Sequence, residues 1–285
     1  MTFPIASRSV EAAFLAACRD ELRALKPGNV HIFAAGHGMQ TQHFDDAAKA
    51  AAPWVARDGG SLGKRILEAV EASFAVANCN TNLGILLLCV PLAVAAEQRN
   101  ESQDLRQRLA SVLRDLDRND ASDVFLAIVK ANPAGLGEVD SGDVSSPPGM
   151  TLREAMHLAA DRDRIARAYV TDFADIFEFG LPKLQAARGE TPSSDIAITA
   201  LHMEFLSSFT DSHIVRKFGT NTAEYVRSEA QKYAPFWRHD DLSELLAFDR
   251  SLKERGLNPG TTADFVVATL YADKLIALSA TESPS

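Results

Sequence analysis

The sequence predicts an all-α protein, a single globular multi-helix domain with one buried central helix. Apolar residues recur at helical spacing along nearly the whole chain, and the alternating pattern of strands is almost absent. Hydrophobic residues make up 46% and charged residues 24% of the 285 positions, which is an ordinary globular balance. No linker rich in proline or serine divides the chain, so we expect one domain across residues 1–285.

The first half of the chain contains six predicted helices. Their apolar residues mark the ranges 10–22, 44–55, 62–74, 83–96, 105–116 and 125–129. The range 83–96 is apolar on all sides, which predicts a helix that is packed on every face. It is too short to span a bilayer, because a membrane helix needs ~20 residues.

Residues 132–149 interrupt the helical pattern with four glycines and three prolines. A loop of this length inside a helical body is usually functional or mobile, and we expect a functional loop here. Helical spacing then resumes in the ranges 152–160, 165–184, 196–209, 222–233, 242–255 and 262–278. The small polar residues 279–285 predict a flexible tail.

The formal net charge of −9 argues against nonspecific binding to nucleic acids or membrane surfaces. A phosphate-bearing ligand would need a local cationic patch, helix N-termini, or Mg²⁺ held by carboxylates. The three cysteines form no C-x-x-C pair, and the first residues lack the pattern of a signal peptide. We therefore expect a cytoplasmic protein.

Polar residues gather in four islands at the ends of predicted helices. The first island contains Lys26, Gly28 and Asn29 in a Lys-Pro-Gly turn, followed by His37. Lys26 has the point charge that suits a phosphate, and Gly28 lets the backbone approach a ligand closely. An ordinary helix end followed by an exposed loop would explain the same residues.

The second island consists of Asn80, Thr81, Asn82 and Gly84, immediately before the most apolar helix. An unsatisfied buried polar group costs ~1–3 kcal/mol, so buried amides need partners. A helix junction with Thr81 or Asn82 as N-cap accounts for one or two of these residues. A ligand at the helix N-terminus accounts for the rest, and we favour this interpretation.

The third island places His213, Arg216 and Lys217 on one face of a helix that begins near Asp211. Two interpretations remain open for it. One is an N-cap aspartate followed by a solvated basic face. The other is a phosphate clamp beside a carboxylate that is catalytic or binds a metal.

The fourth island begins a late helix and contains Gly260, Thr261 and Asp264. Helix capping explains it as well as an anion-binding turn does. Other carboxylates, among them Asp163, are more typical of solvated surface charges.

Taken in order, the islands resemble the motifs of the triphosphoribosyl-dephospho-CoA synthase family. The matching segments are KPGNV from Lys26, HGM from His37, NTNLGILLL from Asn80, DSHIVRKFG from Asp211 and NPGTTADFVVA from Asn258. Each segment is weak evidence alone, but five in the same order are fairly specific. The resemblance covers the chain from Lys26 to about Ala268.

This resemblance implies an all-helical transferase that joins ATP to 3′-dephospho-CoA and releases adenine. The partners would be these small nucleotides, and the sequence leaves a homodimer open. Lys26, Arg216 and Lys217 would contact phosphate, and the second island would orient the ribose or the base. Asp211 and Asp264 would hold Mg²⁺ or act as the base.

Some positions depart from the family pattern. Leu83 stands where the family often has lysine, Asn82 replaces the more usual histidine, and His31 stands where aspartate is frequent. These departures resemble a divergent branch found in archaea and methylotrophs, in which the acceptor is another metabolite, such as a tetrahydromethanopterin precursor. A non-catalytic nucleotide-binding protein is the third interpretation.

Overall fold

A computed structural model describes the chain except for residues 1–5, 99–101, 133–148, 192 and 282–285. The predicted all-α class is confirmed, and the described residues form no sheet. They contain only two isolated bridges, in the loop after the first helix. The expected functional loop at 132–149 lies almost wholly outside the described residues.

Five of the six helices of the first half begin and end within about three residues of the predicted ranges, but the sixth begins at Arg118, well before the predicted range 125–129. The six helices are α1 (Ser7–Arg23), α2 (Thr41–Val55), α3 (Leu62–Ala77), α4 (Leu83–Glu97), α5 (Leu105–Arg114) and α6 (Arg118–Ala131).

The described residues of the second half form eight α-helices and one π-helix. They are α7 (Leu152–Ala159), α8 (Arg164–Val170), the π-helix η1 (Asp175–Gly180), α9 (Leu181–Glu190), α10 (Ser194–Ser208), α11 (Ser212–Phe218), α12 (Thr220–Lys232), α13 (Ser243–Glu254) and α14 (Gly260–Thr281).

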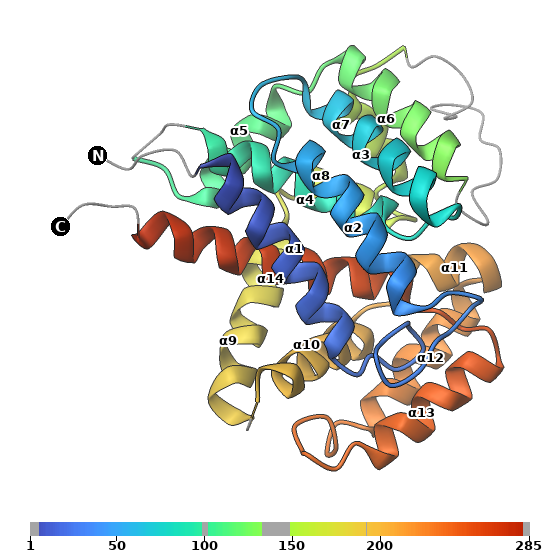
Figure 1. Ribbon diagram of the computed structural model, residues 1–285. Coiled ribbons are helices and arrows are strands. Elements are labelled where there is room, and N and C mark those ends of the chain that lie inside the picture. Colours follow the sequence, from blue (N-terminus) through green and yellow to red (C-terminus); the bar gives the residue numbers. More distant parts are fainter. Residues whose placement is uncertain (1–5, 99–101, 133–148, 192, 282–285) are drawn as a thin grey trace.

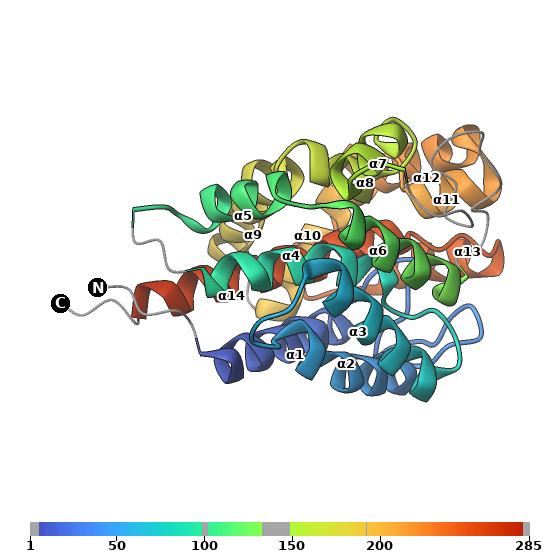
Figure 2. The same cartoon turned by 90° about the horizontal axis from the view of Figure 1, so that it is seen from above.

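Two helices with apolar residues on all sides form the centre of the molecule. α4 is buried along nearly its whole length, as its sequence predicts, and it packs against α14. Figure 1 shows α14 crossing the middle of the molecule beside α1. In Figure 2, α14 and α4 lie between a layer formed by α1, α2 and α3 and another that includes α5, α7 and α8.

A second, smaller group of buried apolar residues joins α10 to α12 and α13. It includes Met203, Trp237 and Phe248, and it reaches the end of the Lys-Pro-Gly region through Leu25. The main core and this smaller group meet along α10 and α14. This packing brings the start of α14 next to the Lys-Pro-Gly turn.

Two further predictions of helix boundaries were wrong. The range 165–184 is not one helix, because Asp172 and Phe173 adopt positive φ values of 49° and 55° after α8. This turn buries the Phe173 ring completely, so tertiary packing stabilises the break. The predicted tail begins too early, since α14 continues to Thr281. In the described part of the chain, no helix has the length and apolarity needed to cross a membrane.

Candidate active site

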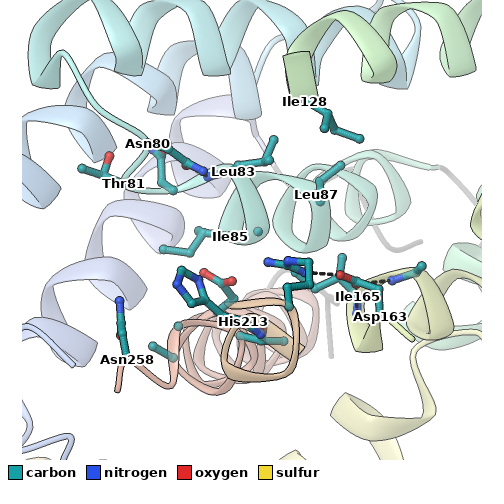
Figure 3. Close-up of a pocket in the computed structure, with 18 of the residues that line it drawn as sticks. Asn80, Thr81, Leu83, Ile85, Leu87, Ile128, Asp163, Ile165, His213 and Asn258 are labelled. Carbon is teal, nitrogen blue, oxygen red and sulfur yellow. Dashed lines mark hydrogen bonds and ion pairs between the residues drawn. The ribbon is translucent and has the colours of Figure 1, made fainter. Parts of the chain in front are cut away.

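A cavity of ≈ 660 Å³ lies where α4, α6, α7, α8, α11 and α14 converge. Its polar lining comes from the segment before α4, from the starts of α11 and α14, and from the connection between α7 and α8. Its apolar lining comes mainly from α4, α6, α7 and α8. In Figure 3, Asn80 and Asn258 lie toward one end of the cavity, and Leu87 and Ile128 lie toward the other.

Residues from all four islands line this cavity. They are Asn29, Asn80, Thr81, Asn82, Gly84, His213, Arg216, Gly260, Thr261 and Asp264. Five predicted site residues lie outside the lining, namely Lys26, Gly28, His37, Asp211 and Lys217. The fold therefore brings the islands together, but it does not expose every residue that the sequence singled out.

Lys26 is fully buried and does not reach the cavity. Its ammonium donates hydrogen bonds to Glu21, to Asn29 Oδ1 at 3.2 Å and to Val30 O at 2.7 Å. Burial lowers the pKa of Lys26, and the ion pair with Glu21 opposes that shift. Because an ammonium has three N–H donors, Lys26 has none left for a phosphate in this conformation.

Gly28 allows the Lys-Pro-Gly turn to pack closely. Its φ is +84°, and a Cβ at this position would lie 2.7 Å from Pro259 Cδ and 2.9 Å from Leu252 Cδ1. The Gly28 N–H donates to Asp249 Oδ1 at 2.8 Å, and the Gly28 carbonyl lies 2.8 Å from His37 Nε2. Gly28 and His37 thus hold the turn in place instead of lining the cavity.

Asn29 is the residue of this turn that lines the cavity. Its Nδ2 donates to Asn258 Oδ1 at 2.8 Å, and both amides belong to the lining. Its Oδ1 accepts from Lys26, so the buried ammonium fixes the amide orientation. Lys26 therefore acts on the cavity indirectly, by holding Asn29.

The second island forms the entry to α4. Asn80 Oδ1 accepts from Leu83 N at 3.2 Å, so Asn80 caps the helix with its side chain. Asn82 occupies the N-cap position, but its Nδ2 donates to Ser73 Oγ at 2.9 Å. Thr81 Oγ1 is buried and has no hydrogen-bond partner among the described residues. Capping by Thr81 or Asn82, the alternative weighed from sequence, is therefore not what the side chains do.

Asp211 joins the N-termini of two helices. Its Oδ1 accepts from Ile214 N at 3.1 Å, and its Oδ2 accepts from Thr262 N at 2.7 Å and from Thr262 Oγ1 at 2.9 Å. Burial raises the pKa of Asp211, and these hydrogen bonds oppose the shift. In return, Thr261 Oγ1 accepts from His213 N at 3.2 Å. Both oxygens of Asp211 are thus engaged in capping.

His213 presents a neutral imidazole to the cavity. Burial lowers its pKa to about 4, with further contributions from the positive charges of Arg216 and Lys217. The Nδ1 atom lies against the start of α14, where a Cβ on Gly260 would approach it to 3.2 Å. Gly260 therefore leaves room for this ring.

Arg216 lines the cavity, whereas Lys217 is exposed and its ammonium lies 5.3 Å from the centre of the Phe218 ring. The Arg216 guanidinium pairs with Asp163 Oδ2. Asp163 Oδ1 meanwhile accepts from Ile165 N at 2.9 Å and caps α8. Of the predicted basic face, only Arg216 remains as a cavity cation, and its charge is already compensated.

Asp264 lies against the first turn of α4. A Cβ on Gly84 would stand 2.0 Å from Asp264 Oδ2, so only glycine leaves space for this carboxylate. Burial raises the pKa of Asp264 well above its usual range, and the charges of Asp211 and Glu21 raise it further. No donor among the described residues bonds to Asp264, so it is the cavity carboxylate without a partner.

Sequence reasoning missed part of the lining. Glu21, Arg162 and the apolar wall that includes Phe125 and Met156 were not singled out, and Asp163 was ranked low. The apolar residues resemble ordinary core positions, since their helical spacing is the same. Arg162 lies in the short connection between α7 and α8, and nothing in the sequence separates it from a solvated surface charge.

No group of three or more His, Cys, Asp or Glu side chains in the described ranges is placed to hold a metal ion. Asp211 is engaged in capping on both oxygens, and Asp163 is likewise engaged on both. Asp264 is the one predicted metal ligand with a free carboxylate. The described part of the site therefore provides a single carboxylate for a cation rather than a protein-built cage.

Comparison with known proteins identifies the family to which the chain belongs. The chain resembles a crystal structure from Archaeoglobus fulgidus, provisionally described as a triphosphoribosyl-dephospho-CoA synthase, with a TM-score of 0.64 and 24% identity. The match covers 82% of this chain and 97% of the other, and it shows a shared fold. No curated protein matched the sequence. The sequence profile described as ATP:dephospho-CoA triphosphoribosyl transferase matches residues 7–283, nearly the whole chain, and the protein belongs to that family.

Proposed function

We propose that this protein transfers the triphosphoribosyl group of ATP to a hydroxyl of dephospho-CoA and releases adenine. The family match over residues 7–283 carries this proposal, and the meeting of all four islands in one cavity supports it. The reaction forms a bond between the acceptor oxygen and the anomeric carbon of the ATP ribose, and it breaks the bond to adenine. Its transition state resembles that of glycoside cleavage.

The polar and apolar parts of the lining suit the two kinds of group in such substrates. Ribose hydroxyls can bond to the amides of Asn29, Asn80 and Asn258. The apolar surface that includes Leu87 and Ile128 suits the uncharged parts of the nucleotides. His213 is neutral at pH 7, so it can accept the proton of the acceptor hydroxyl.

Asp264 is the residue that would hold Mg²⁺, and Mg²⁺ would neutralise charge on the phosphates. Mg²⁺ is typically bound by one or two carboxylates together with substrate phosphates, which agrees with a single free carboxylate here. In the absence of a cation, burial and the neighbouring acidic groups favour a proton on Asp264, since both raise its pKa. Asp211 would act on the site by fixing the starts of α11 and α14.

Adenine release tests the reaction directly. The protein is incubated with Mg-ATP and dephospho-CoA, and free adenine and the coupled nucleotide are measured by chromatography. We expect adenine only when the acceptor is present. Asp264→Asn is expected to lower the rate at least a hundredfold, while Asp161→Asn, an exposed carboxylate outside the lining, keeps wild-type activity.

Failure with one acceptor separates the alternatives. Folded protein that releases no adenine at any pH would exclude dephospho-CoA as the acceptor. Phosphoribosyl diphosphate with a reduced-pterin precursor is then the pair to test. We place the reaction in the cytoplasm, where its nucleotides are found, and a homodimer stays a prediction for light scattering to check.

A further inference from the structure

Among the described residues, five charged side chains line the cavity, and four of the charges can be accounted for in turn. The five are Glu21, Asp163, Asp264, Arg162 and Arg216. Glu21 pairs with the buried ammonium of Lys26, and Arg216 pairs with Asp163. Asp264 lies near other acidic groups and is the cation ligand proposed above. The remaining charge belongs to Arg162.

Arg162 is exposed, and its guanidinium makes no hydrogen bond or ion pair within the described ranges. The residues beside it are anchored. Asp163 caps α8, and Arg164 N donates to Ser212 Oγ at 2.9 Å. Its backbone is therefore held at the cavity while its long side chain stays free to move.

We propose that Arg162 binds the phosphate chain of the nucleotide substrate as the main cation of the cavity. The inference rests on the proposed function, and it names the residue that receives the triphosphate. An arginine provides a planar fork of N–H donors that matches phosphate oxygens. A charge without a partner attracts an anion more strongly than one already paired, because no competing carboxylate must be displaced.

The other candidate cations are less suited. Lys26 uses its three donors on protein acceptors, and Lys217 lies outside the lining. Arg216 faces the cavity, but its charge is already compensated by Asp163. Arg162 therefore contributes the uncompensated positive charge of the lining.

The test compares two arginines that differ in position but not in chemistry. Arg167 is exposed on α8, forms no ion pair among the described residues and does not line the cavity. Arg162→Gln and Arg167→Gln change the net charge equally. Binding of ATP and of inorganic tripolyphosphate is measured by calorimetry in excess Mg²⁺, at low and at moderate salt.

We expect Arg162→Gln to weaken both ligands about tenfold or more, Arg162→Lys to recover part of the affinity, and Arg167→Gln to bind as wild type does. The salt dependence of binding is also expected to shrink only in Arg162→Gln. Equal affinities of Arg162→Gln and wild type would overturn the inference. Because tripolyphosphate binding requires no turnover, the inference can hold even if adenine release fails, and adenine release can succeed while the inference fails.

Discussion

Replacing Asp211 by asparagine tests whether this residue is a helix cap or a metal ligand. The asparagine amide would keep one acceptor for Ile214 N but would direct an NH₂ group at Thr262 N, so the bond from Thr262 N is lost, while the Thr262 hydroxyl can turn and accept from the NH₂ group. An unsatisfied buried N–H costs about 1–3 kcal/mol. Removal of the carboxylate also removes a desolvation cost, which the raised pKa of Asp211 reveals.

The net loss is therefore about 1–2 kcal/mol of unfolding free energy, or a fall in Tm of roughly 2–8 °C for a chain of this size. Chemical denaturation and thermal melting measure it. Asp117→Asn is the matched control, because Asp117 is an exposed N-cap where asparagine serves equally well. A variant Asp211→Asn that melts with wild type but loses the Mg²⁺ dependence of ATP binding would refute the capping role.

Three further predictions concern the cavity. Gly84→Ala is expected to reduce activity more than tenfold, because the new Cβ would displace Asp264. The unfolding free energy should change by less than about 2 kcal/mol, because the clashing atoms are side-chain ends. Kinetics and melting are compared with those of Gly189→Ala, in which the added Cβ meets no neighbour. Asp264→Asn is expected to reduce the gain in ATP affinity that Mg²⁺ gives, and a calorimetric gain equal to that of wild type would contradict a ligand role. His213 has a pKa of about 4 in the folded state against ~6.5 in the unfolded state, so only its neutral form is compatible with the buried site. The fold should therefore lose up to about 3 kcal/mol of unfolding free energy as the pH falls from 6.5 toward 4. His213→Gln is expected to reduce this loss of stability at acid pH, as measured by denaturation curves.

Local sequence predicted most helices because their signals lie within a few residues. The apolar run that becomes α4 has no polar face, so burial on all sides is its one stable arrangement in water. The break at Asp172 and Phe173 could not be predicted in this way. The positive φ values there accompany complete burial of the Phe173 ring, which depends on packing in the folded chain.

The polar islands were visible in the sequence because polar residues beside apolar helices need a reason to be there. Asn80 and Asn82 illustrate the limit of that argument. Both were identified, but the sequence could not tell that Asn80 caps α4 while Asn82 bonds to Ser73. Each choice depends on which donor the folded chain places within reach.

Local residue patterns were enough to predict the helical class, the central apolar helix and the polar islands. Which charges remain available to a ligand depends on the packing of the folded chain. Lys26 and Asp211 looked like site residues, yet the fold buries both and satisfies them with protein partners. Arg162 and Asp264 are left without partners in the described chain. The physical reason is that the reactivity of a charge depends on its neighbours, and those neighbours come from residues far away along the chain.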